Sequence, residues 1–139
     1  NNRSKKEKEA LESFGRNLGI CFQITDDILD YSAKEKVFGK KIGNDFLEGK
    51  ITLPIILLFQ KSNKIERQMI NKFFSQDMRN QNDFNKTLDL IDKYKIIEIC
   101  KKRADYFSNV EADSLSIFEK NFTVEKLQEL SFYIVNRLN

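Results

Sequence analysis

Apolar residues recur at helical spacing along most of the chain. Between about residues 4 and 31, positions three and four apart form one apolar stripe, made of Leu11, Phe14, Leu18, Cys21, Phe22, Thr25, Ile28 and Leu29. This regular spacing over so long a run predicts a single long helix. No segment alternates apolar and polar residues as a half-buried strand does. The pattern therefore predicts an all-α fold.

The segment that follows changes from polar to strongly apolar. Residues 32–50 are polar, contain three of the five glycines and show no period, so they are predicted to form a long loop. Thr52 is then expected to cap a helix that begins Leu53-Pro54, because proline is tolerated in the first helical turn. This helix is apolar on nearly every side through Phe59, which is typical of a central helix.

The remaining segments also predict helices. Asn63 and Glu66 have the spacing of a capping box, for a helix that ends near Phe74. Residues 75–82 are interpreted as a polar connection. Further helical patterns cover about 83–93, 95–118 and 123–138.

Composition excludes several kinds of active site. The chain has 139 residues, the size of one domain, and no histidine, so it cannot build a Ser-His-Asp or Cys-His nucleophile system or a histidine-ligated metal site. Cys21 and Cys100 lack the close spacing of a zinc or redox motif, and we interpret them as buried thiols.

Charge and hydropathy narrow the range of partners. The formal net charge is only +3, and the densest charged run, residues 3–9, alternates in sign, which argues against nucleic acid. The longest apolar run, Ile51 to Phe59, is short and interrupted by Pro54, so no transmembrane segment is expected.

Three aspartates near the end of the first predicted helix stand out. Asp26, Asp27 and Asp30 share an arc of about 100° with Gln23, opposite the apolar stripe. Like charges at this spacing repel, the helix C-terminus disfavours them further, and residues 17–33 contain no basic residue. A divalent cation such as Mg²⁺ would supply the missing charge. A solvated acidic helix face is the alternative.

The predicted loop adds basic groups to this pattern. Glycines beside lysines in residues 38–50 would let the backbone and ammonium groups approach an anion closely. A carboxylate triad followed directly by such a loop suggests a site for a metal ion and a polyphosphate.

The strings LGICFQITDDILDY and GKKIGNDFLEGKITLP carry a specific resemblance. They resemble the second aspartate-rich motif and following loop of trans-isoprenyl diphosphate synthases, and most of all the long-chain, octaprenyl-type polyprenyl diphosphate synthases. The resemblance covers residues 18–54. The later helices are consistent with the same family and carry little signal of their own.

The resemblance implies roles for eight residues. Asp26, Asp27 and Asp30 would bind Mg²⁺, with Asp26 as the expected direct ligand. Asp26, Asp27 and Lys40 would be the catalytic residues. The substrate-binding residues would be Gln23 beside the carboxylates, Lys40 and Lys50 on the diphosphate of the allylic substrate, Asp45 organising the loop, and Phe22 lining the cavity.

The implied reaction joins an allylic diphosphate to isopentenyl diphosphate. The departing diphosphate would be stabilised by Mg²⁺ and basic groups, and the isopentenyl double bond would attack the allylic cation before a proton is lost. The resemblance also implies a cytoplasmic location and a homodimer in the intact enzyme. Contact with a membrane would come only through the lipid product, and no nucleic acid would be bound.

One large departure from the family concerns the first aspartate-rich motif, which the sequence lacks. We therefore interpret residues 1–139 as the C-terminal portion of a polyprenyl synthase domain. We expect this portion alone to have little or no prenyltransferase activity. We also expect an exposed apolar patch on the helix at 51–59. The alternatives are a non-catalytic subunit that supplies one wall of a site to a partner chain, and a decayed fragment. A terpene cyclase or an unrelated helical binding domain fits the loop less well.

Overall fold

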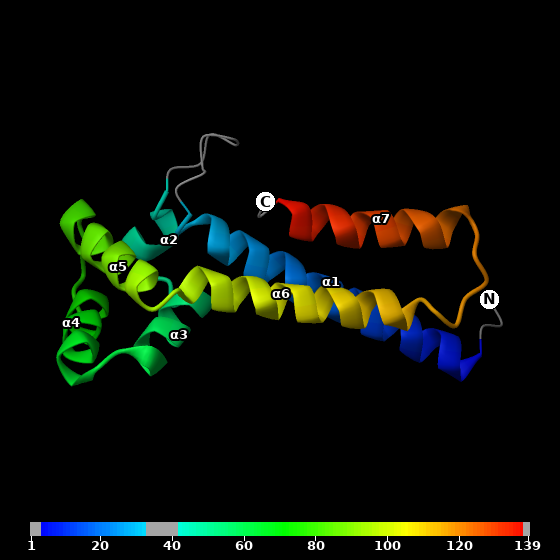
Figure 1. Ribbon diagram of the computed structural model, residues 1–139, viewed down its shortest axis with the longest axis horizontal. Coiled ribbons are helices and arrows are strands. Elements are labelled where there is room, and N and C mark those ends of the chain that lie inside the picture. The colour runs from blue at the N-terminus through cyan, green and yellow to red at the C-terminus, as the bar shows by residue number, and fades with distance from the viewer. Residues whose placement is uncertain (1–3, 33–41, 138–139) are drawn as a thin grey trace. The chain divides into compact units, whose positions relative to one another are not determined.

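A computed structural model describes residues 4–32 and 42–137. Over these residues the chain is helical and contains no strand, which confirms the predicted all-α fold. Figure 1 shows the helices, which are α1 (Lys5–Leu29), α2 (Asn44–Leu47), α3 (Leu53–Lys61), α4 (Lys64–Phe74), α5 (Gln81–Lys93), α6 (Ile96–Ser114) and α7 (Phe122–Asn136).

The short helix α2 corrects the sequence analysis, which predicted a loop throughout 32–50. Gly43 and Gly49 bracket α2 with φ angles of 79° and 78°, a left-handed conformation that glycine adopts without steric cost. A Cβ atom at Gly43 would lie 2.7 Å from ring atoms of Phe84, so this glycine is also required by packing. A four-residue helix is too short to show a period, which explains why the sequence pattern missed it.

The start of α3 is capped differently from the prediction. Thr52 occupies the N-cap position, but its side chain makes no capping hydrogen bond. Its hydroxyl instead donates to the hydroxyl oxygen of Tyr31 at 3.5 Å, and the amide of Leu53 donates to Oδ2 of Asp27 at 3.1 Å. A side chain far away in the sequence thus caps α3, which a local pattern cannot predict.

Capping boxes begin the next two helices. The box predicted for Asn63 and Glu66 is confirmed, since each side chain accepts from the other residue's backbone amide. Asn80 and Asp83 form a second box, so α5 begins at residue 81 instead of about 83. Near the C-terminus, α6 ends at Ser114 instead of about 118.

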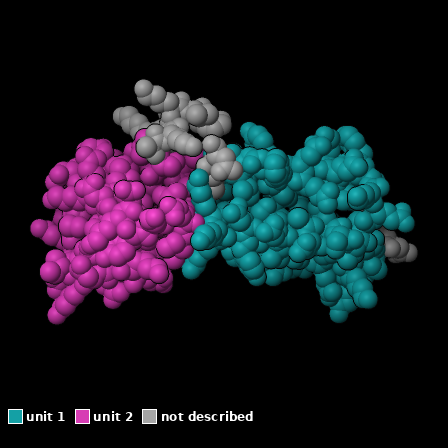
Figure 2. All heavy atoms as spheres, viewed as in Figure 1, with its two compact units in different colours: residues 1–25, 101–139 teal, residues 26–100 magenta. Residues whose placement is uncertain are grey.

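The chain divides into two compact units (Figure 2). The first unit comprises residues 1–25 and 101–139, and the second comprises residues 26–100. The boundaries fall within α1 and α6, so each of these helices contributes to both units.

The first unit packs parts of α1, α6 and α7. Its core contains Phe14, Leu115 and Val124, and α6 lies antiparallel to α1 (Figure 1). Hydrogen bonds join these two helices, from Cys21 Sγ to the Ala104 carbonyl at 3.5 Å and between the Ser13 and Ser114 hydroxyls at 2.9 Å. Two members of the predicted apolar stripe do not join this core, because Leu11 is 39% exposed and Phe22 47%.

The second unit has an aromatic core centred on α2. The ring of Phe46 is fully buried and lies 5.4–6.3 Å, between centroids, from the rings of Phe73, Phe74 and Phe84. Tyr31 extends this cluster, with its ring 5.9 Å from that of Phe84. The aromatic cluster thus joins α2, α4 and α5 to the end of α1.

Helix α3 is mostly buried, as predicted for a central helix, because Ile55, Leu57 and Leu58 are at most 4% exposed. The exposed apolar side chains in the segment 51–59 are those of Ile51 and Ile56. Larger exposed apolar side chains lie on α7, namely Phe122, Phe132 and Tyr133.

Glu66 should make stability depend on pH. The Lys93 ammonium and the Tyr94 hydroxyl both donate to its carboxylate, at 2.7 and 2.6 Å, and these bonds lower the pKa of Glu66 from 4.5 to about 2. Because the folded pKa lies below the unfolded one, this stabilisation is present above about pH 5 and is lost as the pH falls toward 2. Glu66→Gln should therefore lower the free energy of unfolding at pH 7 and lower it clearly less at pH 2.5.

Urea unfolding at the two pH values measures this difference. Glu119→Gln, at an exposed carboxylate, is the control and should leave stability unchanged at both. An equal loss for Glu66→Gln at pH 7 and pH 2.5 would contradict the assignment.

In the part of the chain that the structure describes, no helix is both long and apolar enough to cross a bilayer.

Candidate metal and diphosphate site

The three aspartates occupy the end of α1 and the residue after it. Asp26 is half-buried, whereas Asp27 is 7% and Asp30 2% exposed. A solvated acidic face would leave all three exposed, so this alternative fails for Asp27 and Asp30.

Backbone amides compensate the two buried carboxylates. Oδ2 of Asp27 accepts from the amide of Leu53 in the first turn of α3, and Oδ2 of Asp30 accepts from the amide of Asp45 in α2, both at 3.1 Å. Amides in the first turn of a helix have no partner within it, so a carboxylate there satisfies a donor and lies at the favourable end of the helix dipole. The charges that seemed uncompensated in sequence are thus compensated by segments 15 to 26 residues away.

Lys50 forms a compact turn with α2. Its ammonium lies 2.8 Å from Oδ1 of Asp45 and 2.8 Å from Oε2 of Glu48, and its amide donates to the Asp45 carbonyl at 2.9 Å. These bonds raise the pKa of Lys50 above its ordinary value, so the group remains an ammonium at neutral pH. The side chain of Lys50 is 56% exposed, whereas that of Asp45 is 9% exposed.

Asp30 connects the aspartates to this turn. Besides the bond from the Asp45 amide, the carbonyl of Asp30 accepts from the amide of Gly43 at 2.9 Å. Asp45 then holds Lys50 through its own carboxylate. The structure therefore brings Asp30, Asp45 and Lys50 into one continuous set of contacts, with Asp27 anchored beside it on α3.

Three further residues were predicted for the site. Lys40 lies outside the described residues. Gln23 and Phe22 belong to the first unit and are both exposed on α1. The ring of Phe22 lies 5.7 Å from the guanidinium carbon of Arg137.

The aspartates are suited to fill some of the coordination positions of a metal ion. Among residues 4–32 and 42–137, no group of three or more His, Cys, Asp or Glu side chains is placed to hold a metal. Mg²⁺ commonly takes only one or two carboxylates and completes its coordination with water and phosphate. A carboxylate also has several acceptor positions, so a backbone bond to one oxygen is compatible with metal binding at the same group. Asp26 and Asp27 therefore fit such an ion.

Two residues that the sequence analysis did not single out belong to this region. Tyr31 is 4% exposed, accepts from Thr52 and packs on Phe84. Tyr31 directly follows the string DDILD, and this position is the sequence signal that could have identified it. Arg79 donates to the Leu47 carbonyl at the end of α2, and nothing near it in sequence marks it.

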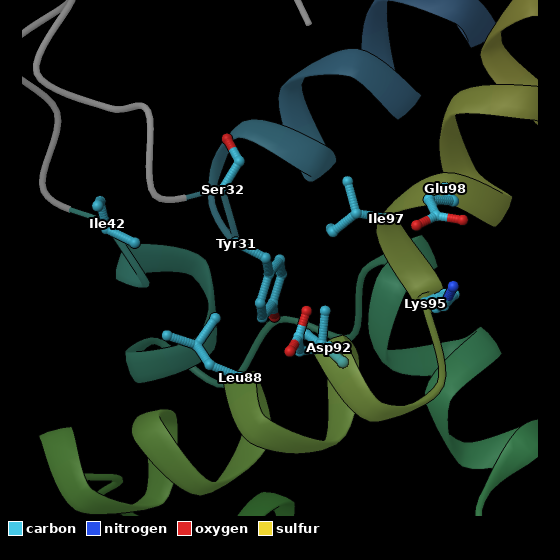
Figure 3. Close-up of a pocket in the computed structure, with 9 residues that line it drawn as sticks. Tyr31, Ser32, Ile42, Leu88, Asp92, Lys95, Ile97 and Glu98 are labelled. Carbon is cyan, nitrogen blue, oxygen red and sulfur yellow. The ribbon is translucent and has the colours of Figure 1, made fainter.

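A pocket of about 480 Å³ opens in the second unit (Figure 3). Its wall combines apolar side chains such as Leu88 and Ile97 with the charged residues Asp92, Lys95 and Glu98. The described lining residues include none of the predicted site residues, so this pocket is not built from them.

The fold defined by these helices is that of the polyprenyl synthases. A crystal structure of a polyprenyl synthase from Caulobacter crescentus, complexed with calcium and isoprenyl diphosphate, has a TM-score of 0.87 and 31% identity over 99% of this chain and 42% of its own. A geranylgeranyl pyrophosphate synthetase from Pyrococcus horikoshii has a TM-score of 0.85 and 34% identity over 96% of this chain and 40% of its own.

Sequence comparison identifies the family. The model of the polyprenyl synthetase family matches residues 1–91. An octaprenyl diphosphate synthase from Haemophilus influenzae is 29% identical over 131 residues, which are 94% of this chain and 40% of that protein. The chain belongs to the polyprenyl synthetase family, as its sequence motifs predict, and it spans about two fifths of the length of these relatives.

Proposed function

We propose that this chain is the part of a trans-prenyltransferase that binds Mg²⁺ and the diphosphate of an allylic substrate. The observation that carries the proposal is the contact network from the Asp30 carboxylate through Asp45 to Lys50, with Asp27 anchored on α3. Carboxylates, which suit a cation, occur in this network together with the Lys50 ammonium, which suits a phosphate, and this supports the proposal. Family membership and the Caulobacter crescentus structure with calcium and isoprenyl diphosphate support the same chemistry.

The chain's residues have distinct proposed roles in the joining of an allylic diphosphate to isopentenyl diphosphate. Asp26, Asp27 and Asp30 would offer carboxylate oxygens to Mg²⁺, which when bound supplies positive charge for the departing diphosphate. Lys50 would donate to a phosphate oxygen, and Asp30 and Asp45 would hold Lys50 in place. The allylic carbon–oxygen bond breaks, the isopentenyl double bond attacks the cation, and a proton is lost. We place Lys40, Gln23 and Phe22 in the same site on the motif resemblance alone.

The proposal also covers the location, the oligomeric state and the second substrate of the intact enzyme. It would act in the cytoplasm as a homodimer, with isopentenyl diphosphate as the second substrate and with membrane contact only through its lipid product. The chain alone would have little or no prenyltransferase activity, because one aspartate-rich motif cannot hold the diphosphate from two sides.

A non-catalytic subunit is the second candidate, favoured by the exposed apolar side chains of α7 that a partner could cover. The N-terminal part of the Haemophilus influenzae octaprenyl diphosphate synthase can be fused to this chain or added as a separate polypeptide. Activity on simple mixing would favour the subunit, and activity only after fusion would favour the portion of one enzyme.

Binding of inorganic pyrophosphate tests the proposed site directly. We expect calorimetric titration of the chain to show binding that requires Mg²⁺. Lys50→Ala should weaken it about 10- to 100-fold, the effect of losing a hydrogen bond between charged groups. Lys61→Ala, at an exposed lysine at the end of α3, is the control and should leave the affinity unchanged. A pyrophosphate affinity that changes neither on removal of Mg²⁺ nor with Lys50→Ala would refute the proposal.

A further inference from the structure

Arg79 lies in the connection between α4 and α5 and holds three carbonyl groups together. Its Nε donates to the Leu47 carbonyl at 3.3 Å, and its Nη1 donates to the carbonyls of Phe73 at 3.3 Å and Gln76 at 2.8 Å. Leu47 ends α2, and Phe73 lies in the last turn of α4. One guanidinium thus fixes the ends of two helices, where a positive charge is also favoured by their dipoles.

The same guanidinium packs closely on Gly49. A Cβ atom at Gly49 would lie 2.5 Å from Nη2 of Arg79, and the φ of this glycine is +78°. The guanidinium carbon also lies 5.9 Å from the ring centroid of Phe74, which belongs to the aromatic core around Phe46. Arg79 therefore packs against the aromatic core of the second unit and lies close to the glycine that precedes Lys50.

Two sets of contacts hold the Lys50 turn. Asp45 and Glu48 bind the Lys50 ammonium, and Arg79 donates to the Leu47 carbonyl and lies close to Gly49. We propose that Arg79 is a positioning residue for Lys50, fixing the turn over residues 47–50 so that the ammonium is presented to a diphosphate. This inference rests on the function proposed above.

Arg67 provides a matched control in the same unit. Its Nε donates to the Phe59 carbonyl at 2.9 Å and its Nη2 to the Gln60 carbonyl at 2.8 Å, and its guanidinium carbon lies 5.6 Å from the ring centroid of Phe59. Arg67 therefore binds the end of α3 with the same chemistry that Arg79 uses at the end of α2.

The test compares Arg79→Lys with Arg67→Lys in the 139-residue chain. Lysine keeps the charge but cannot reproduce the planar set of donors. We expect Arg79→Lys to weaken binding of inorganic pyrophosphate with Mg²⁺ about tenfold, and Arg67→Lys to leave it within about twofold. Thermal unfolding midpoints, measured for both variants, should change to a similar extent. Equal affinities for the two variants would overturn the inference, as would wild-type affinity in Arg79→Lys.

A second readout does not depend on ligand binding. The Lys50 ammonium, held by two carboxylates, should give a slowly exchanging ¹⁵N–¹H signal in NMR spectra, and Arg79→Lys should broaden or remove it while Arg67→Lys keeps it. If the wild-type chain fails to bind pyrophosphate, the proposed function fails and this signal still decides the role of Arg79. If Arg79→Lys does not fold, Gly49→Ala perturbs the same contact from the other side and should have the same two effects. An unchanged Lys50 signal in a folded variant would overturn the inference.

Discussion

Phe46→Ala should lower the free energy of unfolding by about 3–5 kcal/mol, the usual cost of truncating a fully buried phenylalanine. The Phe46 ring has no exposed surface and contacts three other aromatic rings. A loss of this size is a large part of the stability of a small domain, so the second unit should unfold well below the wild-type temperature. Urea unfolding followed by circular dichroism measures the change.

Phe132→Ala is the control for this substitution. Phe132 is 70% exposed on α7, so its truncation should change stability by no more than about 0.5 kcal/mol. Similar losses for the two variants would show that the aromatic cluster around α2 is not the core of the second unit.

Asp27→Asn should reduce prenyl transfer at least about 100-fold in a protein that joins this chain to the N-terminal part of a relative. Asparagine keeps an oxygen that can accept from the Leu53 amide, so α3 stays capped while the negative charge for the metal is lost. A loss of several kcal/mol in electrostatic stabilisation at the transition state corresponds to this factor. Steady-state turnover at saturating Mg²⁺ measures it, and the unfolding midpoint should change little.

Asp89→Asn serves as the comparison in the same fused enzyme. Asp89 is an exposed carboxylate on α5, and its neutralisation should leave turnover unchanged. Unchanged turnover in Asp27→Asn would remove this residue from the proposed metal site.

The helices could be predicted because their signals are local. The spacing of Asn63 and Glu66 indicated a capping box, and the structure has it. The cap on α3 could not be predicted in the same way, because the donor at Leu53 and the acceptor at Asp27 are 26 residues apart. Thr52 has the residue type and position of a cap, yet its hydroxyl donates to Tyr31 instead.

Part of the contact network around α2 could be expected from the sequence, because two neighbouring strings contain its residues. Asp27, Asp30, Asp45 and Lys50 all fall in the two strings that resemble the family. The structure joins Asp30, Asp45 and Lys50 through backbone and side-chain bonds, whereas Asp27 accepts from Leu53 of the second string. Arg79 lies outside both strings, and a lone arginine in a polar connection has no pattern that points to Leu47. Its place follows only from the three-dimensional packing of the ends of α2 and α4.

The two cysteines offer a way to observe the units separately in solution. Cys21 and Cys100 are both fully buried, and burial raises the pKa of the Cys21 thiol to about 11. Thiol reagents attack the thiolate, so neither group reacts until its surroundings open. Cys21 belongs to the first unit and Cys100 to the second. The alkylation rate of each thiol, followed by mass spectrometry, therefore reports how often its own unit opens, without any introduced label.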